Sequence, residues 1–267
     1  TVGGGGLGIY HYGVLKCLYE EGMVPRVISG SSAGSIYAAI FATKKYEELK
    51  QVYINPVNHY HRELTFHIDV DSPELINIQA FQKRPAKSSY MRRLKRFLTE
   101  GYLLDIRIIE EFLKDNLGDI TFQVHPSYDD NRVINANKGA YDRTGWILNI
   151  TVTGYGAHDN HRILNYLTAP NVLIWSACLA SCAIPYVYAP VNLYCKNEDG
   201  KIIQYVEGGI TNPRFCCMNT ISVGRKFVDG SLSADLPTQK LSELFNVIAS
   251  LPPRQIHGNA IFPQNPY

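Results

Sequence analysis

Two glycine clusters near the start of the chain, separated by one helix and one strand, constrain the fold more than any other feature of the sequence. Apolar residues recur at helical spacing over residues 8–22, a short apolar strand follows over residues 26–29, and a helix rich in small residues spans residues 35–43. One glycine cluster precedes the first helix, and the other joins the strand to the second helix. This order is typical of a sheet that carries helices on both faces, so the sequence predicts an α/β fold.

The second cluster, Gly30-Ser31-Ser32-Ala33-Gly34, matches the G-x-S-x-G nucleophile elbow. Glycines are needed two positions on either side of the nucleophile, because its backbone is strained and Cβ atoms at those positions would collide. The turn presents Ser32 Oγ at a helix N-terminus, where backbone N–H groups and the helix dipole favour negative charge. Ser32 is therefore the candidate nucleophile, and the alternative interpretation is an ordinary helix N-cap.

The first cluster lies one helix and one strand before Ser32, so both clusters are expected at the carboxyl ends of neighbouring parallel strands. Its backbone N–H groups can then point at the oxyanion that forms when Ser32 attacks an ester. The cluster also matches the G-x-G-x-x-G dinucleotide pattern, but the next strand ends without the acidic residue that holds a ribose. A nucleotide-binding module remains the alternative from another class. The glycines concerned are Gly3, Gly4, Gly5, Gly6 and Gly8.

Composition limits the remaining possibilities. Hydrophobic residues make up 45% of the 267 residues and charged residues 19%, which excludes an intrinsically disordered chain. The formal charge is only +2, which argues against nucleic acid as the main partner. Six cysteines lack the spacing of a metal site, and we expect neither a metal nor a cofactor. The apolar stretch over residues 172–184 is shorter than the ~20 residues of a membrane span, so it predicts a buried core helix.

Further along the chain, helices are predicted around residues 90–98 and over residues 106–117. Strands are predicted over residues 121–125, 146–153 and 226–228, the last of which ends at Asp229-Gly230. Residues 83–96 hold seven basic residues and no acidic one, with apolar residues at helical spacing among them. This run predicts either a solvated helix face or an interfacial helix on a lipid surface. The basic residues proposed for such a contact are Lys83, Arg84, Arg92, Arg93, Lys95 and Arg96.

The glycine-rich loop, the elbow and the late Asp-Gly after a strand together resemble the patatin-like phospholipases. Residues 11–16, 164–170, 175–185 and 229–247 are similar to the fungal and plant intracellular triacylglycerol lipases of that class. The resemblance extends over about residues 3–247. It implies a three-layer α/β/α fold with a mainly parallel central sheet. We expect one lipid acyl hydrolase domain over residues 1–251, with its first strand truncated, and an irregular tail over residues 252–267.

The resemblance also implies the roles of individual residues, because this class uses a Ser–Asp dyad without histidine. Ser32 corresponds to the nucleophile, Asp229 to the general base and Gly3, Gly4, Gly5 and Gly6 to the oxyanion loop. Gly8, Gly30, Gly34 and Gly230 correspond to the other motif glycines. The alternative for Asp229 is a turn aspartate before Gly230, with Asp235 as its nearest rival. A histidine base at His257 would satisfy the order of an α/β-hydrolase triad, and His11 is interpreted as a packing residue.

We therefore expect a serine lipid-ester hydrolase with an acyl-enzyme mechanism, a triacylglycerol substrate and a role in lipid catabolism. The alternatives at the same site are a phospholipase and a lysophospholipid acyltransferase. A catalytically silent lipid-surface protein is a further alternative. The expected location is intracellular, on the periphery of a lipid droplet or membrane.

Overall fold

The computed structural model describes residues 10–45, 48–49, 87–123, 139–156, 161–197, 200–205, 225–230 and 238–245. Within α6, side chains are described from Arg93 onward. The glycines at positions 3–6 and 8 lie outside these ranges, as do Lys83, Arg84, Asp235 and His257. The helices are α1 (Tyr10–Glu20), α2 (Ala33–Thr43), α6 (Lys87–Glu100), α7 (Arg107–Leu117), α8 (Ala140–Thr144), α9 (Ile174–Ser181) and α10 (Thr238–Phe245). The strands are β1 (Val27–Gly30), β2 (Ile147–Gly154), β3 (His161–Leu164), β4 (Val191–Asn192), β5 (Tyr194–Lys196), β6 (Ile202–Gln204) and β7 (Lys226–Asp229).

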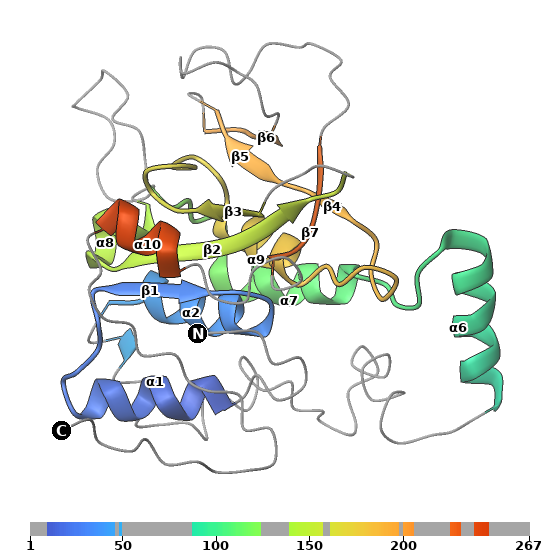
Figure 1. Ribbon diagram of the computed structural model, residues 1–267, viewed down its shortest axis with the longest axis horizontal. Coiled ribbons are helices and arrows are strands. Elements are labelled where there is room, and N and C mark those ends of the chain that lie inside the picture. Colours follow the sequence, from blue (N-terminus) through green and yellow to red (C-terminus); the bar gives the residue numbers. More distant parts are fainter. Residues whose placement is uncertain are drawn as a thin grey trace.

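Strand β2 is the centre of the main sheet, with β1 and β3 on its two sides (Figure 1). β1 pairs with β2 in parallel, and β3 pairs with β2 antiparallel. Ile150 of β2 is paired with Gly30 of β1 and also with Leu164 of β3. β7 pairs antiparallel with residues 152–154 of β2. Residues 152 and 153 also pair with β3. Because a strand has two hydrogen-bonding edges, β3 occupies one edge of β2, and β1 and β7 share the other. β1 and β7 therefore run toward each other along one edge, and their carboxyl ends meet beside Thr151.

The sheet is mixed in the residues that the structure describes. The pair at its core, β1 and β2, is parallel, while β3, β7 and β4 are joined by antiparallel pairings. A separate antiparallel pair is formed by β5 and β6. The predicted α/β fold is confirmed, and the parallel pair is the part of the sheet that leads into the elbow.

Helices pack against this sheet. On one side α2 and α9 pack against the strands, and α7 packs against both helices. Every residue of α2 and α9 is buried, and for α9 the apolar stretch over residues 172–184 predicts this burial. On the near side in Figure 1, α10 lies in front of β2, and Phe245 at its end stacks on Tyr166 at 6.3 Å between ring centroids. The packing of these helices on the strands agrees with the predicted α/β class.

Helix α1 packs on α2 through the buried side chains of His11, Leu15 and Tyr19. The His11 ring lies 6.3 Å from the ring of Tyr37 in α2. His11 is thus a packing residue, as predicted. The helices predicted around residues 90–98 and over residues 106–117 are also confirmed, as α6 and α7.

The strand predicted over residues 121–125 is wrong in its described part. Thr121 forms only an isolated bridge with Leu173. The next two residues donate backbone hydrogen bonds to Val172 and Pro170, and the Thr121 carbonyl accepts one from Ala140. The segment is held between two loops because its backbone groups are satisfied there, and it adds no strand to the sheet.

Among the residues that the structure describes, no helix combines the length and the apolar character needed to cross a bilayer. Helix α6 stands apart from the sheet at the far right of Figure 1, beyond α7.

Candidate active site

Ser32 occupies the turn between β1 and α2, two residues after Gly30. Its backbone has φ 50° and ψ −131°, a region that non-glycine residues rarely adopt and that costs of order 1–3 kcal/mol. The residue is buried, with 6% of its surface exposed. The strained turn that the sequence predicts at Ser32 is therefore present.

Gly30 has a steric reason to be glycine. A Cβ atom at this position would lie 2.5 Å from the Gly34 carbonyl oxygen and 2.6 Å from the Ser35 Cα. Both obstacles are backbone atoms, so they cannot rotate away as a flexible side chain could. The close approach of β1 to the first turn of α2 thus requires the absence of a side chain at Gly30.

Hydrogen bonds with two other serines, one donated and one accepted by the Ser32 backbone, hold the strained residue in place. The Ser32 N–H donates to Ser181 Oγ at 2.8 Å, and Ser181 Oγ donates to the Thr151 carbonyl at 2.7 Å. Ser35 Oγ donates to the Ser32 carbonyl at 2.6 Å. Ser181 ends helix α9 and is fully buried. The elbow is therefore fixed to both α9 and the central strand β2.

Ser181 is a residue that the sequence interpretation missed. The sequence predicts only a core helix there, and the signal that points to Ser181 is a serine among apolar residues. A buried hydroxyl requires a partner, so a serine in a core helix indicates that another backbone comes close.

Asp229 is the last residue of β7 and is 1% exposed. It lies opposite Val152 of β2, and its backbone N–H donates to the Ala183 carbonyl at 3.1 Å. The next residue, Gly230, passes so close to β2 that a Cβ atom there would lie 2.5 Å from the Thr151 carbonyl oxygen. Gly230 therefore has the same kind of steric requirement as Gly30.

The structure brings the segments of Ser32 and Asp229 to one place. Gly30 lies opposite Ile150 and Asp229 opposite Val152, on the same edge of β2. Two residues of a strand span about 7 Å, so the ends of β1 and β7 face each other across a short gap. Thr151 lies at that gap, with Oγ1 donating to the Gly30 carbonyl at 3.5 Å.

The surroundings of Asp229 include buried, neutral sulfur groups. The pKa of the Cys182 thiol is raised well above its ordinary value, first by burial, then by Cys178 and by the Asp229 carboxylate. Burial also raises the pKa of Cys178 to about 12. The pKa of Tyr188 is raised by burial and then by Cys182. The Cys182 thiol therefore stays protonated at neutral pH and adds no negative charge beside Asp229.

The other predicted site residues divide into two groups. Gly34 lies in the first turn of α2 and is buried. The glycines of the predicted oxyanion loop, and the rival residues Asp235 and His257, lie outside the described residues. In the parts of the chain that the structure describes, no group of three or more His, Cys, Asp or Glu side chains is arranged to hold a metal ion.

The chain is similar to known proteins over most of its length. A family model described as patatin-like phospholipase matches residues 2–215. The chain is 34% identical to triacylglycerol lipase ptl3 of Schizosaccharomyces pombe, over 92% of this chain and 42% of that protein. It is 37% identical to triacylglycerol lipase 4 of Saccharomyces cerevisiae, over 92% of this chain and 22% of that protein. It is 35% identical to triacylglycerol lipase SDP1L of Arabidopsis thaliana, over 92% of this chain and 26% of that protein. The chain thus spans less than half the length of each of these relatives.

Proposed function

The chain belongs to the patatin-like phospholipase family, and we propose that it is a serine lipid-ester hydrolase whose substrate is triacylglycerol. The observation that carries the proposal is the meeting of the Ser32 elbow and Asp229 at one edge of β2. The choice of triacylglycerol is supported by the fungal and plant relatives, which are named triacylglycerol lipases.

In the proposed reaction, Ser32 Oγ attacks the ester carbonyl carbon while the Asp229 carboxylate takes the hydroxyl proton. The negative charge that forms on the carbonyl oxygen is stabilised by backbone N–H groups of Gly3, Gly4, Gly5 and Gly6. Losing one such donor typically costs ~3 kcal/mol of transition-state stabilisation. Collapse of the tetrahedral intermediate breaks the bond to the alcohol, which leaves with the proton held by Asp229. An acyl group then remains on Ser32 Oγ.

The second half of the reaction returns the enzyme to its starting state. Asp229 takes a proton from water, and the resulting hydroxide attacks the acyl-enzyme carbonyl. The Ser32 oxygen leaves, recovers its proton from Asp229 and releases a fatty acid. Direct base catalysis by a carboxylate is supported by the burial of Asp229, because burial removes the water that would otherwise stabilise its charge. The proposed biological role is lipid catabolism.

The proposal is tested by labelling with a fluorophosphonate probe, together with fatty-acid release from triacylglycerol. Ser32→Ala should abolish both signals, and Asp229→Asn should slow both by about a hundred- to ten-thousand-fold. The adjacent Ser31→Ala is the matched control, because the buried Ser31 Oγ has no hydrogen-bond partner among the residues that the structure describes and has no assigned role. Undiminished labelling of Ser32→Ala would remove Ser32 as the nucleophile.

The substrate panel of the same assay separates the remaining alternatives. Faster release from phospholipid than from triacylglycerol would indicate a phospholipase. Acyl transfer to a lysophospholipid would indicate an acyltransferase that uses the same acyl-enzyme. Lipid binding without any release would indicate a catalytically silent lipid-surface protein, and measurable NAD or ATP binding would indicate the nucleotide-binding alternative.

The proposal includes a place of action, the surface of an intracellular lipid droplet or membrane. A water-insoluble substrate must be reached at such a surface. The basic run of residues 83–96 supports this contact, because positive charge near a headgroup layer favours binding. Arg92, Arg93, Lys95 and Arg96 of this run lie in α6.

A further inference from the structure

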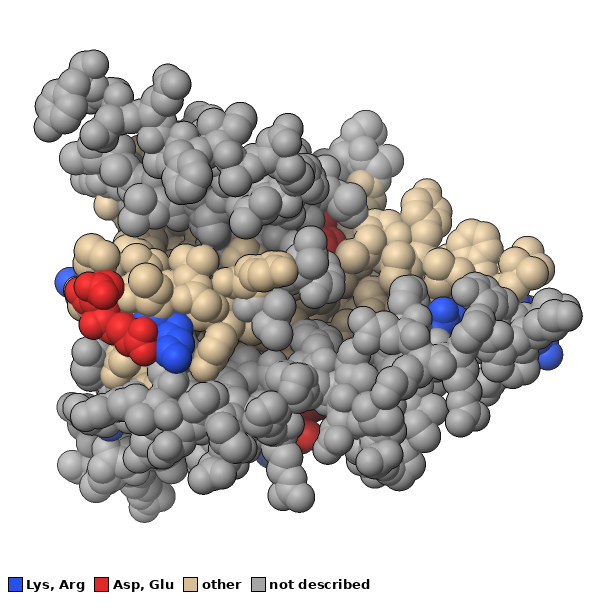
Figure 2. Space-filling model, turned by 90° about the horizontal axis from the view of Figure 1, so that it is seen from below, with Lys and Arg blue, Asp and Glu red and all other residues tan. Residues whose placement is uncertain are grey.

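Helix α6 turns apolar side chains toward solvent. Leu94, Phe97 and Leu98 recur at helical spacing on one side, and Leu98 is 75% exposed and Leu94 52%. An amphipathic helix of a globular protein ordinarily packs its apolar side against the core. In Figure 2 the end of the molecule that carries α6, at the right of the view, shows uncharged tan atoms bordered by blue basic atoms. No acidic atom of a described residue is visible at that end.

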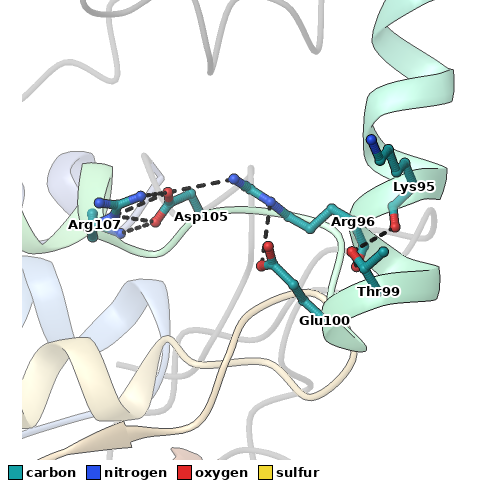
Figure 3. Close-up of polar contacts among 6 residues, drawn as sticks. All are labelled: Lys95, Arg96, Thr99, Glu100, Asp105 and Arg107. Carbon is teal, nitrogen blue, oxygen red and sulfur yellow. Dashed lines mark hydrogen bonds and ion pairs between the residues drawn. The ribbon is translucent and has the colours of Figure 1, made fainter.

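Ion pairs at the C-terminal end of α6 orient the helix and so determine which side points outward (Figure 3). Arg96 Nε lies 3.7 Å from Glu100 Oε2, and Arg96 Nη2 lies 3.7 Å from Asp105 Oδ2. The same Asp105 oxygen lies 2.7 Å from Arg107 Nη2. Each residue of a helix is rotated by about 100° from the one before, so Arg96 lies nearly opposite Leu94 and Leu98. Holding Arg96 toward the start of α7 therefore holds the two leucines away from it.

Exposed apolar side chains also occur in the segment that follows the C-terminal end of α6 and in the segment that pairs with it there. Leu103 and Tyr186 are both exposed, and the Leu103 N–H donates to the Tyr186 carbonyl at 3.1 Å. Tyr186 has a φ of 64°, which is rare for a residue with a bulky side chain. The turn that carries it follows Ala183, whose carbonyl accepts the Asp229 N–H. Backbone hydrogen bonds thus join this apolar surface to the strand end that carries Asp229.

We propose that this surface, named the docking face and formed by Leu94, Phe97, Leu98, Leu103 and Tyr186, inserts into a phospholipid layer that bears anionic headgroups. Lys95, which follows Leu94, contacts the phosphates. The inference rests on the proposed function, because it assigns the surface through which the Ser32 site reaches a lipid ester. A lipid layer fits better than a second copy of the chain, because basic residues flank the apolar side and Glu100 is engaged by Arg96.

The apolar part of the docking face is tested with Leu94→Ser/Leu98→Ser. Burying one leucine in an apolar layer contributes about 1.5–3 kcal/mol, and tenfold in affinity corresponds to about 1.4 kcal/mol. We expect the double variant to bind vesicles of phosphatidylcholine with one third phosphatidylserine at least about tenfold more weakly in co-sedimentation. Met23→Ser and Leu244→Ser are the matched controls, because both side chains are exposed and lie outside the docking face.

The basic part is tested with Lys95→Glu. A lysine near an anionic surface contributes about 1 kcal/mol, so reversing its charge should weaken binding to the anionic vesicles by about fivefold or more. Binding to pure phosphatidylcholine should change little. Lys201→Glu makes the same charge change at another exposed position and should leave both vesicle types bound as before.

Tyr186→Asn tests the second segment of the face. Asparagine tolerates positive φ, so the turn is kept while the aromatic ring is lost. We expect vesicle binding to fall severalfold, with an unchanged circular dichroism spectrum for all of these variants.

Binding is measured in the Ser32→Ala background as well, because docking needs no chemistry. If the proposed function is wrong, no fatty acid is released from any lipid while the vesicle results above still hold. The docking proposal is overturned if the leucine double variant binds vesicles as tightly as the parent. It is also overturned if that variant instead turns a dimer into a monomer in gel filtration without loss of vesicle binding.

Discussion

Helices α2 and α6 use their apolar residues in opposite ways. All residues of α2 are buried between the sheet and the neighbouring helices, and the strained Ser32 lies directly before its first residue. The described side chains of α6 include three exposed apolar residues, Leu94, Phe97 and Leu98. A rigid, densely packed helix can hold a strained elbow in place, whereas an exposed amphipathic helix is free to meet a partner surface. The proposed catalysis at the elbow and the proposed binding to a lipid surface therefore depend on different physical properties of the two helices.

The largest effect on the free energy of unfolding is expected from removing a core side chain of α2. Phe41 is 1% exposed, and Phe41→Ala should lower the free energy of unfolding by about 3–5 kcal/mol, because it removes apolar burial and leaves a cavity. Leu98→Ala on α6 should change it by no more than about 0.5 kcal/mol. Urea denaturation of both variants measures the difference. Equal destabilisation would mean that α6 packs in solution much as α2 does, and the contrast between the helices would be lost.

A smaller effect is expected from Ser181→Ala, which affects the support of the elbow rather than its packing. The variant leaves the Ser32 N–H and the Thr151 carbonyl without their buried partner. We expect a loss of stability of about 2–3 kcal/mol. We also expect slower fluorophosphonate labelling, because Ser32 is then less firmly held.

The matched control for Ser181→Ala is Ser176→Ala. Ser176 is also buried in α9, but its hydroxyl donates to the Leu173 carbonyl and accepts the Tyr194 N–H, away from the elbow. It should cost stability without slowing the labelling. If both variants slow labelling equally, general loosening of α9 accounts for the effect and Ser181 has no specific role.

Gly30→Ala should cost about 1–3 kcal/mol of stability, because the added methyl group meets backbone atoms at the base of α2. Gly13→Ala provides a control of opposite sign. Gly13 lies inside α1 with nothing within 4 Å of an added Cβ, so alanine should stabilise that helix by up to about 1 kcal/mol. Thermal unfolding shifts of opposite direction would confirm that the cost at Gly30 is steric. A neutral Gly30→Ala would mean that the turn can relax.

The sequence predicted the parts of the site that depend on local rules. Gly30 and Gly34 identify the elbow because their spacing reflects collisions within a few residues, and the apolar strand before them is equally local. The charge-free stretch around α9 identifies a buried helix for the same reason. The role of Asp229 came from resemblance, since an Asp-Gly pair alone is a common turn.

The remaining features depend on contacts between residues far apart in the chain. The Ser32–Ser181 hydrogen bond joins positions 149 residues apart, and no local pattern selects that partner. The same holds for β1 and β7, which meet on one edge of β2. The segment at Thr121 has strand-like residues, but its hydrogen bonds are satisfied by loops, so composition alone predicted a strand that does not form.

The smallest effect concerns the ion pairs that orient α6, and it depends on pH. The hydrogen bond from Arg107, together with the positive charges of Arg107 and Arg96, lowers the pKa of Asp105 below its ordinary value. A carboxyl group whose pKa is lower in the folded state stabilises the fold above its unfolded-state pKa, and this contribution is lost as the pH falls through the folded-state pKa.

Asp105→Asn should therefore be less stable than the parent at pH 7, by no more than about 1 kcal/mol for so accessible a cluster. The two proteins should converge in stability as the pH is lowered below about 4, the ordinary range of a carboxyl group. Urea denaturation at several pH values measures this convergence, and a constant difference at all pH values would show that Asp105 acts through packing instead. Because Arg96 then loses one of its two partners, Asp105→Asn should also weaken vesicle binding slightly at pH 7, whereas Phe41→Ala, measured where it is still folded, should not.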